Sequence, residues 1–226
     1  MVPTRSQPIK PFTAVVFDMD GTLIDSEAVF REIVFDVSSE MGFEMTDSVH
    51  HAMIGNTHEH TSKLLAEAYG VSFPYAIFDE KCRVKMQARM EVAVPLKTGV
   101  VELLDELRDR RIPMAVATSS RSAHAMSHLG GAGILDRFDT VVTRDDVINP
   151  KPHPEPYLTA ARRLSIAPEL CLAVEDSHTG VRAAVAAGMQ TIMVPDLVHP
   201  NEEIVALCHD VLESLHHLRA AAFTAG

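Results

Sequence analysis

Carboxylate side chains follow two of the apolar segments in this chain, directly where each segment ends. Asp18 and Asp20 come after the first apolar run, and Glu175 and Asp176 come after a later one. Several carboxylates in one place repel one another unless a hard cation lies among them, and Mg²⁺ prefers oxygen ligands. A carboxylate can also attack phosphorus, while a second carboxyl group exchanges a proton with the leaving oxygen. These four residues therefore indicate a magnesium site at which an aspartate could act as the nucleophile.

A hydroxyl group and an ammonium group follow two other apolar runs, the first directly and the second after a short loop. Thr118 follows the run 113–117, and Lys151 with Pro152 follows the run 140–142. Such groups can hold phosphoryl oxygens while negative charge builds on them. Phosphate monoester hydrolysis needs accelerations of up to ~10²¹-fold, whereas general acid–base catalysis supplies about 10²–10⁴-fold. A phosphatase would therefore need the metal, the lysine and the hydroxyl group together with the acids.

The apolar runs have the composition of strands that are buried on both faces, as in a parallel sheet. Five runs of this kind are present: 13–17, 113–117, 140–142, 170–174 and 191–194. Helical patterns separate the later runs: 100–110, 122–128, 155–164 and 179–187. This alternation predicts an α/β fold with a doubly wound parallel sheet. Ligands bind beyond the carboxyl ends of such strands, so the polar residues that follow the runs are expected to meet there.

The segment between the first and second runs does not continue this alternation. It has amphipathic helical patterns throughout and no strand-like run. We therefore predict two domains, an α/β core formed by residues 1–26 and 96–226 and an inserted α-helical domain formed by residues 27–95. The tail after Glu202 is predicted to contain one or two helices.

Composition excludes several classes of protein. The 226 residues are 46% hydrophobic and carry a formal net charge of −11, which repels nucleic acid and anionic membranes. The three cysteines are far apart without a Cys-x-x-Cys pair, so neither a disulfide framework nor a zinc site is predicted. No apolar run approaches the ~18 residues of a membrane span, and the start of the chain lacks the apolar stretch of a secretory signal. We expect a cytoplasmic protein without nucleic-acid or membrane partners.

Four sequence motifs together resemble the haloacid dehalogenase superfamily, and most closely its β-phosphoglucomutase-like and sugar-phosphatase branch. The motifs occur in order and span nearly the whole predicted core: Asp18-x-Asp20-Gly21-Thr22-Leu23, Thr118, Lys151-Pro152 and Glu175-Asp176-Ser177. The resemblance implies a Rossmann-like core with an inserted helical cap. It also implies a Mg²⁺-dependent phosphatase that hydrolyses a small phosphate monoester of a sugar, a polyol or a nucleoside through a phosphoryl-aspartate.

The resemblance also implies a role for each residue of the motifs. Asp18 would be the nucleophile and a metal ligand. Asp20 would be the general acid and base, and its backbone carbonyl would ligate the metal. Asp176 would complete the Mg²⁺ shell, and Glu175 would bind the metal directly or through water.

The remaining site residues would bind the substrate. Thr118, Ser119 and Lys151 would hold the phosphoryl group. The choice of substrate is expected to depend on the cap loop, through Gly55, Asn56 and His58. It is also expected to depend on Arg121, which stands three residues after Thr118. We expect a small phosphorylated substrate and a monomer or, at most, a weakly associating dimer.

The nearest alternative activity is that of a phosphomutase of the β-phosphoglucomutase type. Such mutases carry a histidine shortly after the nucleophile, where Phe30 stands here, and an arginine in the cap loop, where this chain has none. A dehalogenase would lack the second aspartate, because a departing halide needs no proton, and Asp20 is present. Phosphonate cleavage would need a Schiff-base lysine in the cap. Lys63, Lys81 and Lys85 are available there, but none lies in a recognisable loop context.

Less specific interpretations remain for single motifs. Asp-x-Asp-Gly also fits a calcium loop, although Leu23 and Ile24 interrupt the alternating acids that such a loop requires. His124 and His128 could share one face of a helix, but no third zinc ligand is near them in the sequence. A catalytically idle binding module on the same fold is the alternative from another class of protein. It is disfavoured because every catalytic position is filled.

Overall fold

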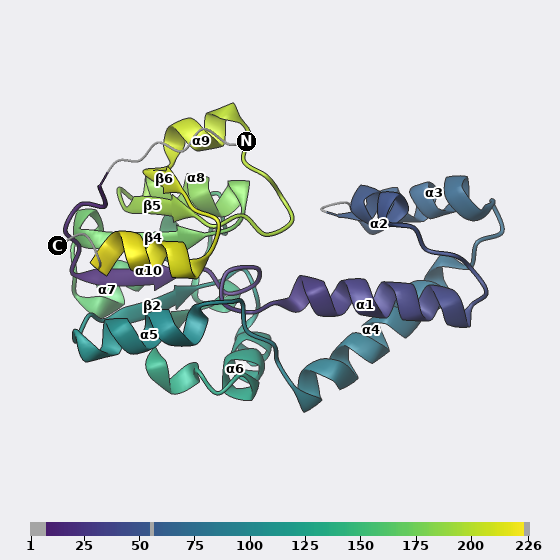
Figure 1. Ribbon diagram of the computed structural model, residues 1–226, viewed down its shortest axis with the longest axis horizontal. Helices are drawn as coiled ribbons and strands as arrows, with labels where there is room; N and C mark the ends of the chain where they lie inside the picture. Colours follow the sequence, from purple (N-terminus) through teal and green to yellow (C-terminus); the bar gives the residue numbers. More distant parts are fainter. Residues whose placement is uncertain (1–7, 55–56, 224–226) are drawn as a thin grey trace. The chain divides into compact units, whose positions relative to one another are not determined.

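Six parallel strands form the sheet of the α/β core, in the order β3-β2-β1-β4-β5-β6 (Figure 1). The computed structural model describes residues 8–54 and 57–223. The strands are β1 (Ala14–Phe17), β2 (Met114–Ala117), β3 (Thr140–Val142), β4 (Cys171–Glu175), β5 (Gln190–Met193) and β6 (Asp210–Val211). The predicted α/β fold with a parallel sheet is confirmed. Each of the five predicted strands is present and differs from its expected ends by at most one residue.

Helices cover both faces of this sheet. They are α5 (Val100–Asp109), α6 (Ser122–Gly131), α7 (Glu155–Leu164), α8 (His178–Ala186), α9 (Glu202–Leu207) and α10 (Leu215–Phe223). Three short 3₁₀ segments precede or follow strands: Leu135–Arg137, Arg144–Asp146 and Pro168–Leu170. The predicted helical tail is therefore interrupted by the two-residue strand β6, which is too short to leave an apolar run in the sequence.

Alternate residues of each central strand face opposite helical layers. Val16 of β1 belongs to a buried apolar cluster with Tyr157 and Ala160 of α7. Val15 of β1 points the other way and lines a small space with Leu103 of α5 and with side chains of α10. A strand covered on both faces can be apolar at every position, which is why β1 shows no polar alternation.

A second compact unit consists of Ser26–Val94, while Met1–Asp25 and Pro95–Gly226 form the first. The second unit contains α1 (Ser26–Glu40), α2 (Asp47–Met53), α3 (His58–Tyr69) and α4 (Tyr75–Val92). Side chains of all four helices, among them Val34, Leu65 and Phe78, form its apolar core. Thr46 and Thr57 begin α2 and α3 by accepting hydrogen bonds from backbone N–H groups, as N-cap residues do.

Two further expectations from composition can be compared with the described residues. Within 8–54 and 57–223, no helix has the length and apolar character needed to cross a bilayer. Cys82, Cys171 and Cys208 are all buried free thiols.

The sheet order places the ends of β2, β1 and β4 side by side. Phe17 pairs with Val116 on one side and with Val174 on the other. The residues that directly follow these strands therefore share one edge of the sheet. Asp18 is fixed at this edge because its backbone N–H donates to the carbonyl oxygen of Val174 at 2.9 Å.

Candidate active site

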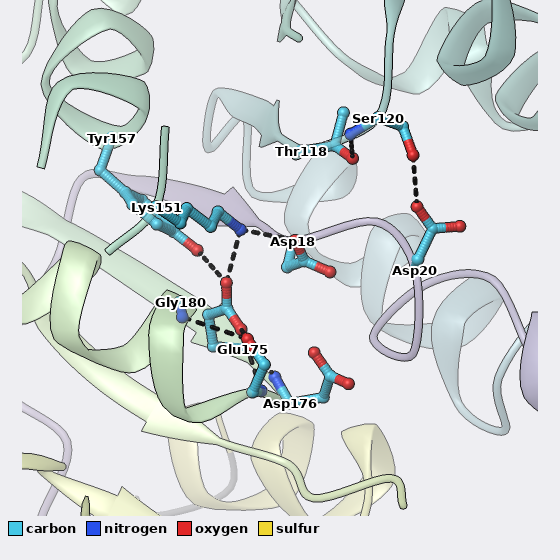
Figure 2. Close-up of polar contacts among 10 residues, drawn as sticks. Asp18, Asp20, Thr118, Ser120, Lys151, Tyr157, Glu175, Asp176 and Gly180 are labelled. Atoms are coloured by element: carbon cyan, nitrogen blue, oxygen red, sulfur yellow. Dashed lines mark hydrogen bonds and ion pairs between the residues drawn. The ribbon is translucent and has the colours of Figure 1, made fainter. Parts of the chain in front are cut away.

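Three carboxylates gather at this edge of the sheet (Figure 2). Asp18 follows β1, Glu175 is the last residue of β4, and Asp176 comes directly after it. Each offers one oxygen atom such that the three oxygens lie within 4.8 Å of one another. We call these three residues the acidic cluster. The sequence motifs thus meet in space at the carboxyl ends of neighbouring strands.

Lys151 provides the positive charge inside this cluster. Its Nζ lies 2.5 Å from Asp18 Oδ1 and 2.5 Å from Glu175 Oε1. The side chains of Lys151, Asp18 and Glu175 are 4%, 11% and 0% exposed, so these charges interact without much screening by water. Three carboxylates and one ammonium group leave two negative charges when all four are ionised.

Glu175 is held as a carboxylate by several donors. The Tyr157 hydroxyl donates to Oε1 at 2.8 Å, and the Ser177 hydroxyl donates to Oε2 at 2.9 Å. The backbone N–H groups of Asp176 and Ser177 also donate to Oε2, each at 3.1 Å. Burial pushes the pKa of Glu175 upward, but the charge of Lys151 and these hydrogen bonds outweigh it and leave the pKa below its usual value.

The other two members of the acidic cluster are compensated less fully. Burial raises the pKa of Asp18 well above its usual value, against the opposing charge of Lys151. Burial likewise raises the pKa of Asp176, and the charges of Asp18 and Glu175 raise it further. When all three carboxylates are ionised, the cluster therefore holds more negative charge than Lys151 neutralises. An oxygen-ligated divalent cation fits both this charge and this donor set.

Two glycines make room for the carboxylates. A Cβ atom on Gly180 in α8 would lie 1.7 Å from Glu175 Oε1, and a Cβ on Gly21 would lie 2.2 Å from Asp176 Oδ2. Gly21 also has a φ of +87°, a conformation that side-chain-bearing residues rarely adopt. Neither position can accept a larger residue without displacing a carboxylate.

Asp20 lies beside the acidic cluster and is oriented by a different group. The Ser120 hydroxyl donates to Asp20 Oδ2 at 2.8 Å, and the Ser120 backbone N–H donates to Thr118 Oγ1 at 3.0 Å (Figure 2). Asp20 and the loop after β2 are therefore joined through one serine. Thr118 is 2% exposed, whereas Ser119 is exposed at the surface of the same loop.

The structure thus brings together six of the residues singled out in the sequence and adds two. Tyr157 and Ser120 were missed as site residues, because a tyrosine in a helix and a serine in a loop are ordinary without knowledge of their contacts.

The residues predicted to select the substrate have no contact with the acidic cluster among those described above. Arg121 is exposed at the N-terminus of α6. His58 in the second unit contacts the Tyr75 hydroxyl, with Nδ1 at 3.0 Å. Gly55 and Asn56 lie outside the described residues.

Comparison with protein families gives a match over most of this chain. The family model for haloacid dehalogenase-like hydrolases matches residues 15–194. The chain is 34% identical to a phosphorylated carbohydrates phosphatase of Thermotoga maritima, covering 79% of this chain and 83% of that protein. It is 32% identical to a fructose-1-phosphate phosphatase of Escherichia coli K12, covering 81% of this chain and 96% of that protein.

Solved structures with the same fold include two that cover almost the whole chain. A hydrolase from Deinococcus radiodurans with bound phosphate and sodium aligns with a TM-score of 0.81 at 30% identity, covering 96% of this chain and 97% of the other. A putative β-phosphoglucomutase from Thermotoga maritima aligns with a TM-score of 0.77 at 28% identity, covering 93% of this chain and 97% of the other.

Proposed function

This chain belongs to the haloacid dehalogenase-like hydrolases, and on that basis we propose that it hydrolyses a small phosphate monoester through a phosphoryl-aspartate on Asp18. The observation that carries this proposal is the position of the Asp18 carboxylate. It lies at the carboxyl end of the central strand β1, 2.5 Å from the Lys151 ammonium and within the acidic cluster. A nucleophilic carboxylate, a cation and a metal-binding set are thus concentrated at one point.

We propose that the acidic cluster holds Mg²⁺, with the backbone carbonyl of Asp20 as a further ligand. When bound, the cation offsets the negative charge of the substrate phosphate and of the carboxylates around it. The raised pKa values of Asp18 and Asp176 support this assignment, because a divalent cation favours their ionised forms. Glu175 would bind the cation directly or through water.

In the first step, an Asp18 carboxylate oxygen forms a bond to phosphorus while the bond from phosphorus to the ester oxygen breaks. Asp20 donates its proton to that departing oxygen and becomes a carboxylate. In the second step, Asp20 takes a proton from water, which attacks phosphorus and releases Asp18 and inorganic phosphate. The Ser120 hydroxyl at 2.8 Å keeps Asp20 in place for both transfers.

The phosphoryl oxygens are held by Thr118, by Lys151 and by the loop at Ser119. These groups come from the ends of β2 and from the loop after β3, on one side of β1. They act on the charge that develops during transfer, which is where fixed donors lower the barrier most.

The substrate that we propose is a phosphorylated sugar or a similar polyol phosphate. The two relatives described above carry names of this kind, a phosphorylated carbohydrates phosphatase and a fructose-1-phosphate phosphatase. We assign the role of a cap to residues 27–95 and substrate selection to Gly55, Asn56, His58 and Arg121. We further propose a cytoplasmic enzyme, monomeric or weakly dimeric, without nucleic-acid or membrane partners.

Phosphomutase activity is the second candidate, because a putative β-phosphoglucomutase is among the structures with this fold. Phe30 occupies the position where such mutases carry a histidine, and it packs against the apolar core of the second unit. A phenylalanine cannot exchange a proton, so this position gives no support to the mutase.

The test is phosphate release from a panel of sugar and nucleotide phosphates, with Mg²⁺ and with EDTA, in wild type and in Asp18→Asn. We expect Mg²⁺-dependent release in wild type and loss of turnover in the variant, because an amide neither attacks phosphorus nor ligates Mg²⁺ well. Substantial activity in the folded variant would show that the nucleophile is another residue. Conversion of glucose-1-phosphate to glucose-6-phosphate without phosphate release, in the presence of the bisphosphate primer, would favour the mutase.

A further inference from the structure

A further carboxylate, Asp196, reaches the same edge of the sheet from the segment after β5. The backbone N–H of Val194 donates to the carbonyl oxygen of Glu175 at 2.7 Å, which ties this segment to β4. The Asp196 side chain is 12% exposed, and its Oδ1 accepts a hydrogen bond from Lys97 Nζ at 2.7 Å. Its other oxygen, Oδ2, is buried and has no hydrogen-bond partner in the part of the chain that the structure describes.

Asp196 Oδ2 and Asp176 Oδ2 both lie beside Gly21. A Cβ atom built on Gly21 would lie 3.4 Å from Asp196 Oδ2 and 2.2 Å from Asp176 Oδ2. Both oxygens therefore lie close to the position that a side chain at residue 21 would occupy. The free oxygen of Asp196 is thus directed toward the acidic cluster rather than toward solvent.

Lys97 holds Asp196 from the opposite side. Its Nζ also lies 3.5 Å from Asp25 Oδ1, and its backbone N–H donates to the carbonyl oxygen of Leu23 at 2.9 Å. The lysine therefore binds Oδ1 of Asp196 and leaves Oδ2 for another donor. A buried carboxylate oxygen without a donor is unfavourable, so a donor is expected when the site is complete.

We propose that Asp196 is a positioning residue of the metal site, with Oδ2 accepting a hydrogen bond from water in the coordination shell of the cation. Mg²⁺ keeps several of its waters when it binds to proteins, and such waters are hydrogen-bond donors. The orphaned oxygen and the hydrated cation are therefore complementary. This inference rests on the cation site of the proposed function, and it adds an outer carboxylate to the acidic cluster.

Because Asp196 is paired with Lys97, variants of the two residues distinguish an effect of Asp196 on the cation from a purely structural role of the pair. Asp196→Asn keeps an oxygen that can accept from Lys97 but removes the charge that faces the cation. Lys97→Met breaks the same pair and leaves a full negative charge at Asp196. If Asp196 acts on the cation, the first change weakens cation binding and the second strengthens it. If Asp196 only anchors Lys97, both changes act in the same direction.

The experiment measures Mn²⁺ binding to the full chain by electron paramagnetic resonance, with Mg²⁺ as competitor and no substrate present. Mn²⁺ is the probe because it shares the preference of Mg²⁺ for carboxylate and water ligands. We expect Asp196→Asn to weaken Mn²⁺ binding about 10-fold, as loss of an outer partner of a metal site does. Lys97→Met is expected to bind Mn²⁺ more tightly than wild type. Asp25→Asn is the matched control: it removes the other carboxylate beside Lys97 and should leave the affinity unchanged.

Each outcome decides the matter. Opposite shifts in Asp196→Asn and Lys97→Met, with Asp25→Asn unchanged, support the inference. Wild-type affinity in Asp196→Asn, or equal weakening in both variants, overturns it while leaving the cation site itself intact. Absence of Mg²⁺-displaceable Mn²⁺ binding in wild type overturns the cation site and this inference together. Lys97→Gln replaces Lys97→Met if circular dichroism shows that the latter does not fold.

Discussion

Replacing Gly180 by alanine tests whether the space beside Glu175 is as restricted as the structure indicates. Gly180 lies in α8 and is buried, and its backbone N–H donates to Ser177 Oγ at 3.1 Å. An alanine Cβ would lie 1.7, 1.9 and 2.2 Å from Oε1, Cδ and Oε2 of Glu175. These distances are far shorter than van der Waals contact, so the Glu175 carboxylate must move away from its partners.

Two effects of opposite sign decide the magnitude. Alanine is about 1 kcal/mol more favourable than glycine inside a helix, so helix propensity alone predicts a more stable variant. Overpacking a core costs about 1–3 kcal/mol, and removing one partner of a buried ion pair costs about 3–5 kcal/mol. Because Glu175 is displaced from Lys151 but not removed, we expect a net loss of about 2–3 kcal/mol. For a chain of this size, that corresponds to a fall in Tm of roughly 4–12 °C.

The assay is thermal unfolding followed by circular dichroism in EDTA, with Gly130→Ala as the matched control. Gly130 lies in α6, is exposed, and has no atom within 4 Å of the position that a Cβ would take. The control should therefore be as stable as wild type, or more stable by up to about 1 kcal/mol. If Gly180→Ala unfolds at the wild-type temperature, the inference that Glu175 is tightly enclosed is refuted. Equal destabilisation of both variants would instead point to a general effect of alanine at these glycines.

Three further predictions concern the same site. Tyr157→Phe removes one hydrogen bond to a buried carboxylate and should lower the free energy of unfolding by about 1.5–3 kcal/mol, measured by urea denaturation; an unchanged midpoint would contradict the contact. The raised pKa values of Asp18 and Asp176 mean that the metal-free folded state binds more protons than the unfolded state, so their contribution to stability is lost as pH rises. Added Mg²⁺ should accordingly raise Tm more at about pH 8 than at about pH 5.5, and an equal rise at both would refute the assignment. Ser120→Ala frees Asp20 and should lower kcat by about 10-fold with a small change in KM; a change confined to KM would exclude a role in proton transfer.

The central strands and the family were predictable from the sequence because their signals are local. The run at 13–17 is apolar at every position, which only a strand covered on both faces tolerates, and the structure places β1 at the centre of the sheet. Asp18 and Glu175 could be expected to meet because the carboxyl ends of parallel strands share an edge. The comparisons then confirmed the family indicated by the four motifs.

The contacts that complete the site were not predictable in the same way. Tyr157 reaches Glu175 only because α7 packs across β1, and Ser120 reaches Asp20 only because β2 lies next to β1. Both contacts depend on which strands become neighbours, and no short stretch of sequence encodes that. Asp196 illustrates the same limit. Its strand was predicted, but its unpaired oxygen becomes visible only when its burial and the position of Lys97 are known.

The position of β1 between β2 and β4 has a consequence for synthesis of the chain on the ribosome. Residues of β1 pair with partners that follow them by about 100 residues on one side and about 160 on the other, so the first strand made must wait for both neighbours. A nascent chain that ends before β4 carries Asp18 but neither Glu175 nor Asp176. It therefore lacks two of the three carboxylates of the acidic cluster, and β1 has no neighbouring strand on the side where β4 would pair with it. Premature termination would leave an exposed apolar β1, which is a target for chaperones rather than a partly active enzyme.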